Sequence, residues 1–215
     1  MALKVNEIFY SIQGESSYAG YPCVFVRMTG CNLRCSYCDT RYAYEKGEDL
    51  EIFEILDQVR TYGCPLVEVT GGEPLIQRET PALIQGLLDA GFKVLMETNG
   101  SLDIGYVDPR CIRIVDVKCP SSGEVERNDL DNLRRLAQRD EVKFILNDRG
   151  DYEYARGILR LMNRTHVRMG HVHFSPVYGK LAPTLLARWI LDDCLKVRLN
   201  LQIHKIIWDP ERRGV

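Results

Sequence analysis

The sequence lacks the features that mark secreted, membrane and fibrous proteins. Residues 1–7 contain no continuous apolar signal core, and no run approaches membrane-spanning length. No internal repeat, low-complexity tract, Pro/Gly/Ser-rich linker or long basic block occurs, and 28 Lys and Arg against 30 Asp and Glu leave a formal net charge of −2. That balance is atypical of an electrostatic nucleic-acid binder. We therefore expect a single cytoplasmic domain over residues 1–215, without a nucleic-acid or membrane partner.

Common catalytic motifs are also missing. The chain has no P-loop, no G-x-G-x-x-G sequence and no Ser/His/Asp arrangement. Nothing in it therefore indicates a nucleotide triphosphatase, a Rossmann dehydrogenase or a hydrolase. Disulfide scaffolds are usually short and secreted, whereas this chain has 215 residues with eight cysteines. We expect those thiols to stay reduced.

Apolar, β-branched segments alternate with amphipathic segments along most of the chain. This alternation predicts parallel βαβ units joined by right-handed crossovers. The predicted strands span residues 23–29, 66–70, 93–97, 112–118, 142–146, 171–175 and 198–204, with an edge strand over 4–13. The predicted helices span residues 48–62, 80–90, 129–139, 152–162 and 183–196. Because the chain is shorter than the roughly 250 residues of a complete (β/α)₈ barrel, a partial barrel and an open doubly wound sheet both remain.

Polar residues gather where the predicted strands end. They are Thr29, Thr70, Glu97, Thr98, Asp116, Lys118, Ser175 and His204. Ligands in α/β folds usually bind at the carboxyl ends of the strands, so these residues are candidates for one site. The alternative is that strand ends are polar only because loops begin there.

Three of the eight cysteines, Cys31, Cys35 and Cys38, lie in a single loop after a predicted strand. Three thiolates on one loop suit an iron–sulfur cube in which one iron has no protein ligand and can bind a small molecule. A zinc-stabilised binding module remains as the non-enzyme alternative, because a structural zinc site needs a fourth ligand. That ligand would come from His166, His171, His173 or His204. The other cysteines stand alone: Cys23, Cys64, Cys111, Cys119 and Cys194.

The spacing of these three cysteines, with the aromatic Tyr37 before the last, resembles the signature loop of the radical S-adenosylmethionine superfamily. A second match follows the next predicted strand, where residues 70–74 (TGGEP) are similar to that superfamily's GGE motif. The two glycines let the backbone approach a ligand, and Glu73 offers a charge for an ammonium group. The resemblance implies a [4Fe–4S] cluster on the three cysteines. It also implies that S-adenosylmethionine binds at the free iron and is cleaved to a 5′-deoxyadenosyl radical.

Longer matching segments make the resemblance more specific within the superfamily. Residues 7–15, 20–27 and 29–40 closely resemble the 7-carboxy-7-deazaguanine synthase family, and residues 97–100, 116–123 and 202–208 match it more weakly. The resemblance implies conversion of 6-carboxy-5,6,7,8-tetrahydropterin into 7-carboxy-7-deazaguanine with release of ammonia, on the route to queuosine and other 7-deazapurines. It also implies an abbreviated, partly open (β/α) barrel, Mg²⁺, an electron donor such as flavodoxin, and a homodimer. An activating enzyme for a glycyl radical protein shares the cysteines and is the alternative enzyme.

The same resemblance assigns substrate contacts within segment 7–27 and at one strand end, to Ile12, Gln13, Gly14, Arg27 and Thr70. Strand alternation puts Arg27 on one face with Phe25, where a planar guanidinium suits the substrate's carboxylate. The alternative for this arginine is a structural ion pair with Glu7 or Glu68. Gln13 offers both donors and an acceptor, which fits the edge of a heterocycle.

The remaining contacts rest on the resemblance alone. Thr40 matches the magnesium-binding position of the family, where substrate oxygens would complete the coordination shell. Contacts to S-adenosylmethionine are expected from Tyr37, Cys38, Asp39, Gly72, Glu97, Lys118, Cys119, Pro120, Ser121, Ser175 and Pro176. His204 is either a substrate contact or a structural histidine.

Overall fold

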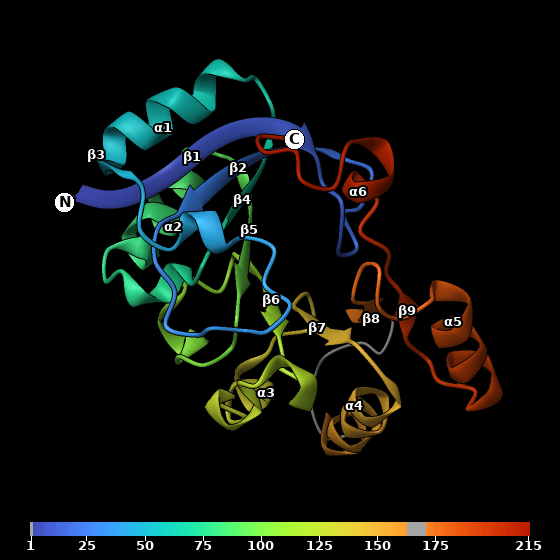
Figure 1. The fold of residues 1–215 in the computed structure, drawn as a ribbon. Coiled ribbons are helices and arrows are strands. Elements are labelled where there is room, and N and C mark those ends of the chain that lie inside the picture. The colour runs from blue at the N-terminus through green and yellow to red at the C-terminus, as the bar shows by residue number, and fades with distance from the viewer. Residues whose placement is uncertain (1, 163–170) are drawn as a thin grey trace.

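The computed structural model describes residues 2–162 and 171–215, and the strands of this part form one continuous sheet (Figure 1). The strands are β1 (Ala2–Ile12), β2 (Pro22–Met28), β3 (Glu48–Glu51), β4 (Leu66–Gly71), β5 (Lys93–Thr98), β6 (Ile112–Asp116), β7 (Glu141–Leu146), β8 (Val172–Pro176) and β9 (Arg198–Leu199). Their order across the described sheet is β3-β1-β2-β4-β5-β6-β7-β8-β9. β1 is antiparallel to both β2 and β3, whereas the pairings from β2 through to β9 are parallel.

Helices follow most of the parallel strands. They are α1 (Ile52–Thr61), α2 (Thr80–Asp89), α3 (Asn132–Arg135), α4 (Arg149–Met162), α5 (Pro183–Asp192) and α6 (His204–Ile207). Short 3₁₀ turns span Arg41–Ala43, Pro74–Ile76, Ile104–Tyr106, Pro120–Ser122 and Val125–Arg127. No helix in the described part of the chain is long and apolar enough to cross a membrane.

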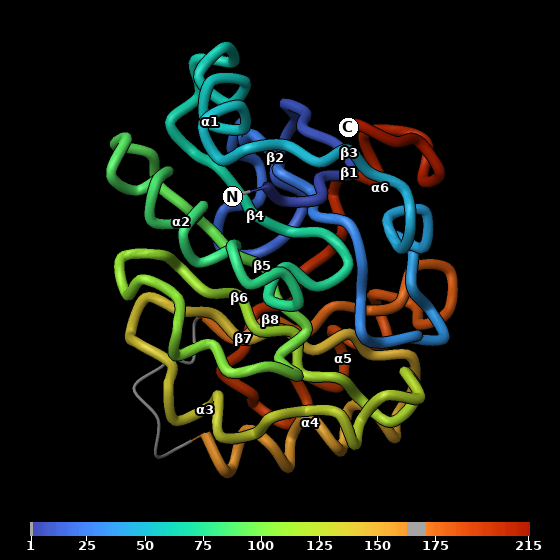
Figure 2. Tube along the Cα trace, turned by 90° about the vertical axis from the view of Figure 1, so that its left-hand side faces the viewer, coloured from blue at the N-terminus to red at the C-terminus, as the bar shows by residue number. Residues whose placement is uncertain are grey.

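The sheet curves into an incomplete barrel. In Figure 1 the strands follow an arc from β1 to β9, with α1 to α5 outside it and α6 near the opening. Figure 2 shows the outer helices in sequence from α1 at the top to α4 at the bottom. The fold class expected from the resemblance, an α/β partly open barrel of mostly parallel strands, is therefore confirmed.

Two apolar clusters hold the helices against the sheet. In the first, alternating valines of β2 and β4, such as Val26 and Val69, pack against Leu83 of α2. In the second, the ring of Phe144 on β7 lies 5.5 Å from that of Phe174 on β8 in an edge-to-face contact. Each fully buried side chain of this kind stabilises the fold by roughly 1.5–3 kcal/mol.

The predicted helix over residues 48–62 is wrong in its first turn. Residues Glu48–Glu51 instead form β3 and pair with β1, so that Leu50 lies opposite Leu3 and β3, rather than β1, is the edge of the sheet. α1 begins only at Ile52, where the side chain of Glu54 accepts a hydrogen bond from the backbone N–H of Glu51. This capping contact sets the start of the helix, and pairing with β1 outweighs the weak strand propensity of the acidic segment.

Several other predicted elements are shorter than expected. The helix expected over 129–139 is reduced to α3, at whose start the side chain of Asn132 donates to the backbone carbonyls of Gly100 and Leu102. The strand expected over 198–204 stops at Leu199. The helix expected over 183–196 ends at Asp192, two residues before Cys194 turns the backbone to a φ of 50°. Such local hydrogen bonds and left-handed residues end elements without changing hydrophobic periodicity.

Candidate active site

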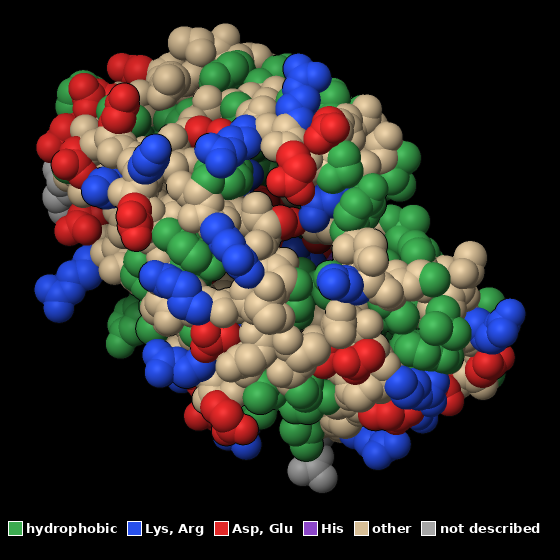
Figure 3. All heavy atoms as spheres, viewed as in Figure 1, with side chains coloured by type: hydrophobic (Ala, Val, Ile, Leu, Met, Phe, Trp, Pro, Cys, Tyr) green, Lys and Arg blue, Asp and Glu red, His purple; other side chains and the backbone are tan. Residues whose placement is uncertain are grey.

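One large cavity opens at the carboxyl ends of the parallel strands, on the face shown in Figure 3. Its volume is about 730 Å³, within the usual range for a ligand site. The lining comes from β1, β2, β4, β5, β6 and β7, from the loop of residues 31–44 after β2, and from the C-terminal segment 202–215. In Figure 3 acidic and basic side chains surround the hollow.

The loop after β2 brings Cys31, Cys35 and Cys38 to this cavity. The thiol of Cys31 accepts a 3.4 Å hydrogen bond from the backbone N–H of Leu33 and a 3.8 Å hydrogen bond from the amide of Asn99. Burial raises the pKa of both Cys31 and Cys35, while the nearby ammonium of Lys118 acts in the opposite direction. The thiols of Cys31 and Cys35 are therefore protonated at neutral pH, and ligation would release their protons.

The turn after β4 packs directly on the cysteine loop. The N–H of Glu73 donates to the carbonyl of Gly30 at 2.8 Å. A Cβ added at Gly72 would collide with that same carbonyl and lie 2.6 Å from the Cβ of Cys31. Only glycine permits this approach, which puts the backbone of the turn beside the three thiols.

Glu73 itself does not line the cavity. Its carboxylate is fully buried and accepts hydrogen bonds from the hydroxyl of Thr98 at 2.8 Å and the N–H groups of Asn99 and Leu75 at 2.7 and 3.1 Å. Our expectation that this side chain would meet an ammonium group is therefore wrong. It ties the glycine turn to the end of β5 instead.

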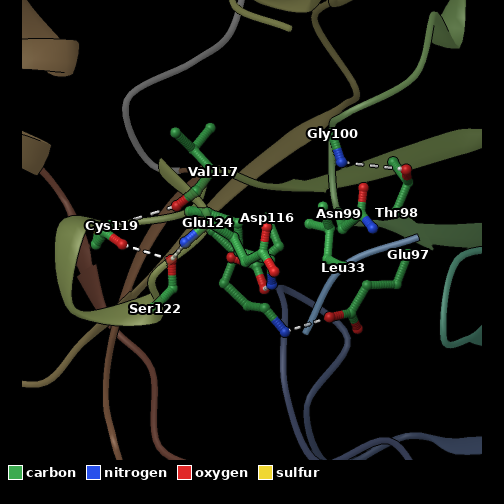
Figure 4. A network of polar contacts seen from close by, with 12 residues as sticks. Leu33, Glu97, Thr98, Asn99, Gly100, Asp116, Val117, Cys119, Ser122 and Glu124 are labelled. Atoms are coloured by element: carbon green, nitrogen blue, oxygen red, sulfur yellow. Dashed lines mark hydrogen bonds and ion pairs between the residues drawn. The ribbon is translucent and has the colours of Figure 1, made fainter. Parts of the chain in front are cut away.

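Two polar atoms near the cysteine loop are buried and lack a partner within the described residues: the hydroxyl of Tyr37 and Oδ1 of Asp116. The other oxygen of Asp116 accepts from the ammonium of Lys118 at 2.6 Å. All three side chains line the cavity, and Figure 4 shows Asp116 near the ends of β5 and β6 with Glu97 and Asn99. Unpaired buried polar atoms are costly, so this region suits a polar ligand that pairs with them.

These features fit a [4Fe–4S] cluster with S-adenosylmethionine. Three thiols on one loop, a glycine turn against them, and unpaired polar atoms beside them are what the two groups need. Within the described residues no group of three His, Cys, Asp or Glu side chains, the loop cysteines included, is already arranged to hold a metal ion, so this finding does not separate the cluster from the zinc alternative. His166, one candidate zinc ligand, lies outside the described residues.

The expected substrate residues form the substrate side of the cavity. Ile12, Gln13, Gly14, Arg27 and Thr70 all line the cavity. The guanidinium of Arg27 also contacts the carboxylate of Glu7 at 2.7 Å, so the ion pair considered as its alternative role does form. Gly14 packs under the ring of His204, since an added Cβ would overlap the imidazole.

An ion pair joins the C-terminal helix α6 to Asp39, the residue after the third cysteine. Lys205 of α6 lies 2.6 Å from a carboxylate oxygen of Asp39, whose other oxygen accepts from the hydroxyl of Thr40 at 3.0 Å. Burial alone would raise the pKa of Asp39, but the charge and hydrogen bond of Lys205 bring that pKa down to about 2. Thr40 thus lies in the cavity beside an ionised carboxylate.

Comparison with known proteins identifies the chain. The model of the radical SAM superfamily matches residues 25–116. The chain is 47% identical to the 7-carboxy-7-deazaguanine synthase of Chlorobaculum tepidum, covering 99% of this chain and 97% of that protein. It is 44% identical to that of Koribacter versatilis, covering 99% of this chain and all of that protein. The chain belongs to the 7-carboxy-7-deazaguanine synthase family. QueE from Escherichia coli has the same fold, with a TM-score of 0.73 over 94% of each chain at 22% identity.

Not every S-adenosylmethionine contact expected from the family resemblance lies at the cavity. Tyr37, Cys38, Asp39, Gly72, Glu97 and Lys118 line it, whereas Cys119, Pro120, Ser121, Ser175 and Pro176 do not. Ser121 donates its N–H to Asp151 at 2.9 Å, and the hydroxyl of Ser175 accepts from Asn200 at 3.2 Å. Val177, directly after β8, does line the cavity.

Sequence reasoning did not assign several charged residues that line the cavity, among them Glu15, Glu68, Lys143 and Lys205. Only Glu68 had a usable signal, because strand alternation puts it on the same face as Thr70. Lys143 is 3% exposed, and its ammonium contacts Glu15 at 3.0 Å and also Glu97. These partners come from the loop after β1 and from β5, so no local pattern connects them.

Proposed function

We propose that this protein converts 6-carboxy-5,6,7,8-tetrahydropterin into 7-carboxy-7-deazaguanine with release of ammonia, as a radical SAM lyase of queuosine and 7-deazapurine biosynthesis. The chain belongs to the family, and one structural observation supports this proposal. One cavity is lined both by the three cysteines and by Gln13 and Arg27. A small anionic heterocycle can therefore lie in the same cavity as the radical source.

Cys31, Cys35 and Cys38 would hold the cluster, and the glycine turn with Asp116 would face S-adenosylmethionine. When bound, these groups would supply the radical chemistry. The chain's own residues position the substrate and exclude water. Gln13 offers its amide to the ring, and Arg27 offers a guanidinium to the carboxylate.

Thr40 is our candidate for the magnesium position. Its hydroxyl lies in the cavity beside the ionised Asp39. Mg²⁺ prefers oxygen ligands and usually keeps several waters, so the carboxylate of the substrate would supply a second ligand. Turnover that falls on treatment with EDTA and recovers with Mg²⁺ in the wild type, but is Mg²⁺-independent in Thr40→Val, supports this assignment. Equal Mg²⁺ dependence in both proteins contradicts it.

The remaining proposals concern the protein as a whole. We propose that the continuous sheet acts as one domain, that two copies form a homodimer, and that an electron donor such as flavodoxin reduces the cluster. All eight cysteines are free thiols, in keeping with a reducing, cytoplasmic setting. Sedimentation at several protein concentrations tests the homodimer.

One assay tests the function. Anaerobically reconstituted protein is incubated with S-adenosylmethionine, a chemical reductant, Mg²⁺ and 6-carboxytetrahydropterin, and the products are identified by mass. We expect 7-carboxy-7-deazaguanine and ammonia in equal amounts. Cleavage of S-adenosylmethionine without this product would favour the glycyl radical alternative. A colourless protein that carries stoichiometric zinc and resists reconstitution would contradict both enzyme hypotheses.

A further inference from the structure

Three carboxylates and one ammonium lie together on the substrate side of the cavity. Glu15, Glu68 and Glu97 supply the carboxylates, and Lys143 supplies the ammonium. Lys143 contacts Glu15 at 3.0 Å and also contacts Glu97. Within the described residues Glu68 has no ion-pair partner, although its side chain is almost fully buried.

The hydrogen bonds around Glu68 run in a fixed direction. The carbonyl oxygen of the Gln13 side chain accepts from the backbone N–H of Glu15 at 3.0 Å, which turns the amide nitrogen toward Glu68. That nitrogen donates to Oε2 of Glu68. In the sheet register Glu68 lies between Phe25 on β2 and Leu95 on β5, both apolar. One amide donor and two apolar neighbours cannot replace the solvation of a carboxylate.

The charges that face Glu68 come from several elements. Nearby titratable groups are Glu15, Cys23, Arg27, Glu97, Cys111 and Lys143. Burial and the carboxylates of Glu97 and Glu15 raise the pKa of Glu68 well above its usual range, against the opposing charges of Lys143 and Arg27. Lys143 is occupied by two other carboxylates, and Arg27 contacts Glu7. When carboxylates crowd one site, one of them keeps its proton.

We propose that Glu68 is a specificity-determining substrate residue that binds the pterin ring as an uncharged carboxylic acid. This inference rests on the proposed function, because it concerns the same substrate. A protonated carboxyl both donates and accepts a hydrogen bond, whereas a carboxylate only accepts. The pterin presents an N–H beside a carbonyl on its pyrimidine ring, and a carboxylic acid matches that pair with two parallel hydrogen bonds. Ionised Glu68 would repel the carbonyl oxygen.

The matching geometry gives a discrimination test. A 3-N-methyl analogue of the substrate replaces the ring N–H with a methyl group, so that one of the two hydrogen bonds to a carboxylic acid cannot form. The wild type should bind the analogue on the order of 10-fold or more weakly than the substrate, because mismatched buried polar groups stay unpaired. Glu68→Ala should lose most of this discrimination, and Glu68→Gln, which also donates and accepts, should recover it. Glu48→Gln, on the exposed edge strand, is the matched control.

Binding is measured anaerobically on the reconstituted protein with S-adenosylmethionine but without reductant. Affinity of the wild type should fall as pH rises through the folded-state pKa of Glu68, and Glu68→Gln should remove this dependence. The difference between the infrared spectra of the wild type and Glu68→Gln at neutral pH should contain the carbonyl band of a protonated carboxyl.

The outcomes separate this inference from the proposed function. A wild type that forms the deazaguanine product, while Glu68→Ala keeps full discrimination, overturns the inference alone. So does an infrared difference spectrum without the protonated carboxyl band. A wild type that cleaves S-adenosylmethionine but neither binds nor converts the pterin contradicts the proposed function, and the infrared band then still decides the protonation state of Glu68.

Discussion

Lys205 and Asp39 form a 2.6 Å ion pair that joins the last helix to the cysteine loop across 166 residues of sequence. The lysine side chain is 10% exposed, whereas that of the aspartate is 52% exposed. Both residues line the cavity. Because the aspartate is exposed, solvent screens part of the energy of the pair. Its effect should appear mainly in the response of the protein to acid.

Removal of the lysine should change the pH dependence of stability. Because the pKa of Asp39 is lowered to about 2, its contribution is present above the unfolded pKa of 3.8 and is lost as pH falls through the folded pKa. Lys205→Met should lower the free energy of unfolding at neutral pH by about 1 kcal/mol or less. It should also flatten the loss of stability between about pH 4 and 2. Urea unfolding across this range measures both effects, with Lys180→Met as the control at the same cavity, and parallel pH curves for wild type and Lys205→Met would contradict the assignment.

Loss of one cluster ligand should prevent cluster assembly. Cys35→Ala removes a thiol that lines the cavity, so the reconstituted protein should lose most of its iron and acid-labile sulfide together. Cys194→Ser changes an exposed thiol at the end of α5 and should keep the wild-type content of both. Iron and sulfide assays with the visible absorption spectrum decide the matter. Equal loss in both variants would mean that the loop cysteines have no special role.

A methyl group at Gly72 should disrupt the turn, whereas one at Gly157 should not. A Cβ at Gly72 meets the backbone carbonyl of Gly30 and the Cβ of Cys31, so Gly72→Ala should cost about 1–3 kcal/mol of stability. It should also reduce iron retention. Gly157 lies inside α4 with open space around it, so Gly157→Ala should stabilise the protein by roughly 0.5–1 kcal/mol. Thermal or urea unfolding compares them, and a neutral Gly72→Ala would show that the turn has more room than its contacts indicate.

Substitutions of Arg27 and of Glu7 should show whether the arginine binds the substrate or only stabilises the fold. Arg27→Ala should raise the substrate KM about 10- to 100-fold with the cluster content unchanged, because a charged hydrogen bond is lost. Glu7→Gln removes the competing carboxylate but keeps a partner for the guanidinium, so substrate affinity should stay equal or improve. Steady-state kinetics with iron analysis tests both variants. If Glu7→Gln weakens the enzyme as much as Arg27→Ala, the arginine serves the fold rather than the substrate.

Patterns within a few residues were enough to predict the chemistry of the cysteine loop. The spacing of the cysteines is local, because residues three or four apart in one loop can face one centre regardless of the fold around them. Strand alternation likewise put Arg27 on the face that proved to line the cavity. The parallel strands were predicted from the alternation of strand and helix segments, which can also be read locally.

The edge strand β3 could not be predicted in this way. Residues 48–51 (EDLE) have weak strand propensity and precede a helical pattern without a break. They form a strand only because β1 presents unpaired backbone groups beside them, with Leu3 opposite Leu50. Pairing with a distant partner leaves no mark on the local sequence.

By itself the sequence determined the cysteine loop, the glycine turn and the alternation of strands and helices, since each depends on spacing and side-chain size within one segment. Tertiary structure alone decided that Lys143 meets Glu15 and Glu97 while Glu68 is left with the amide of Gln13. The protonation state of a buried carboxyl depends on which charges lie within a few ångströms, and here those charges come from separate strands and loops. Barrel closure brings them together, so only the folded chain sets the electrostatics of the substrate side.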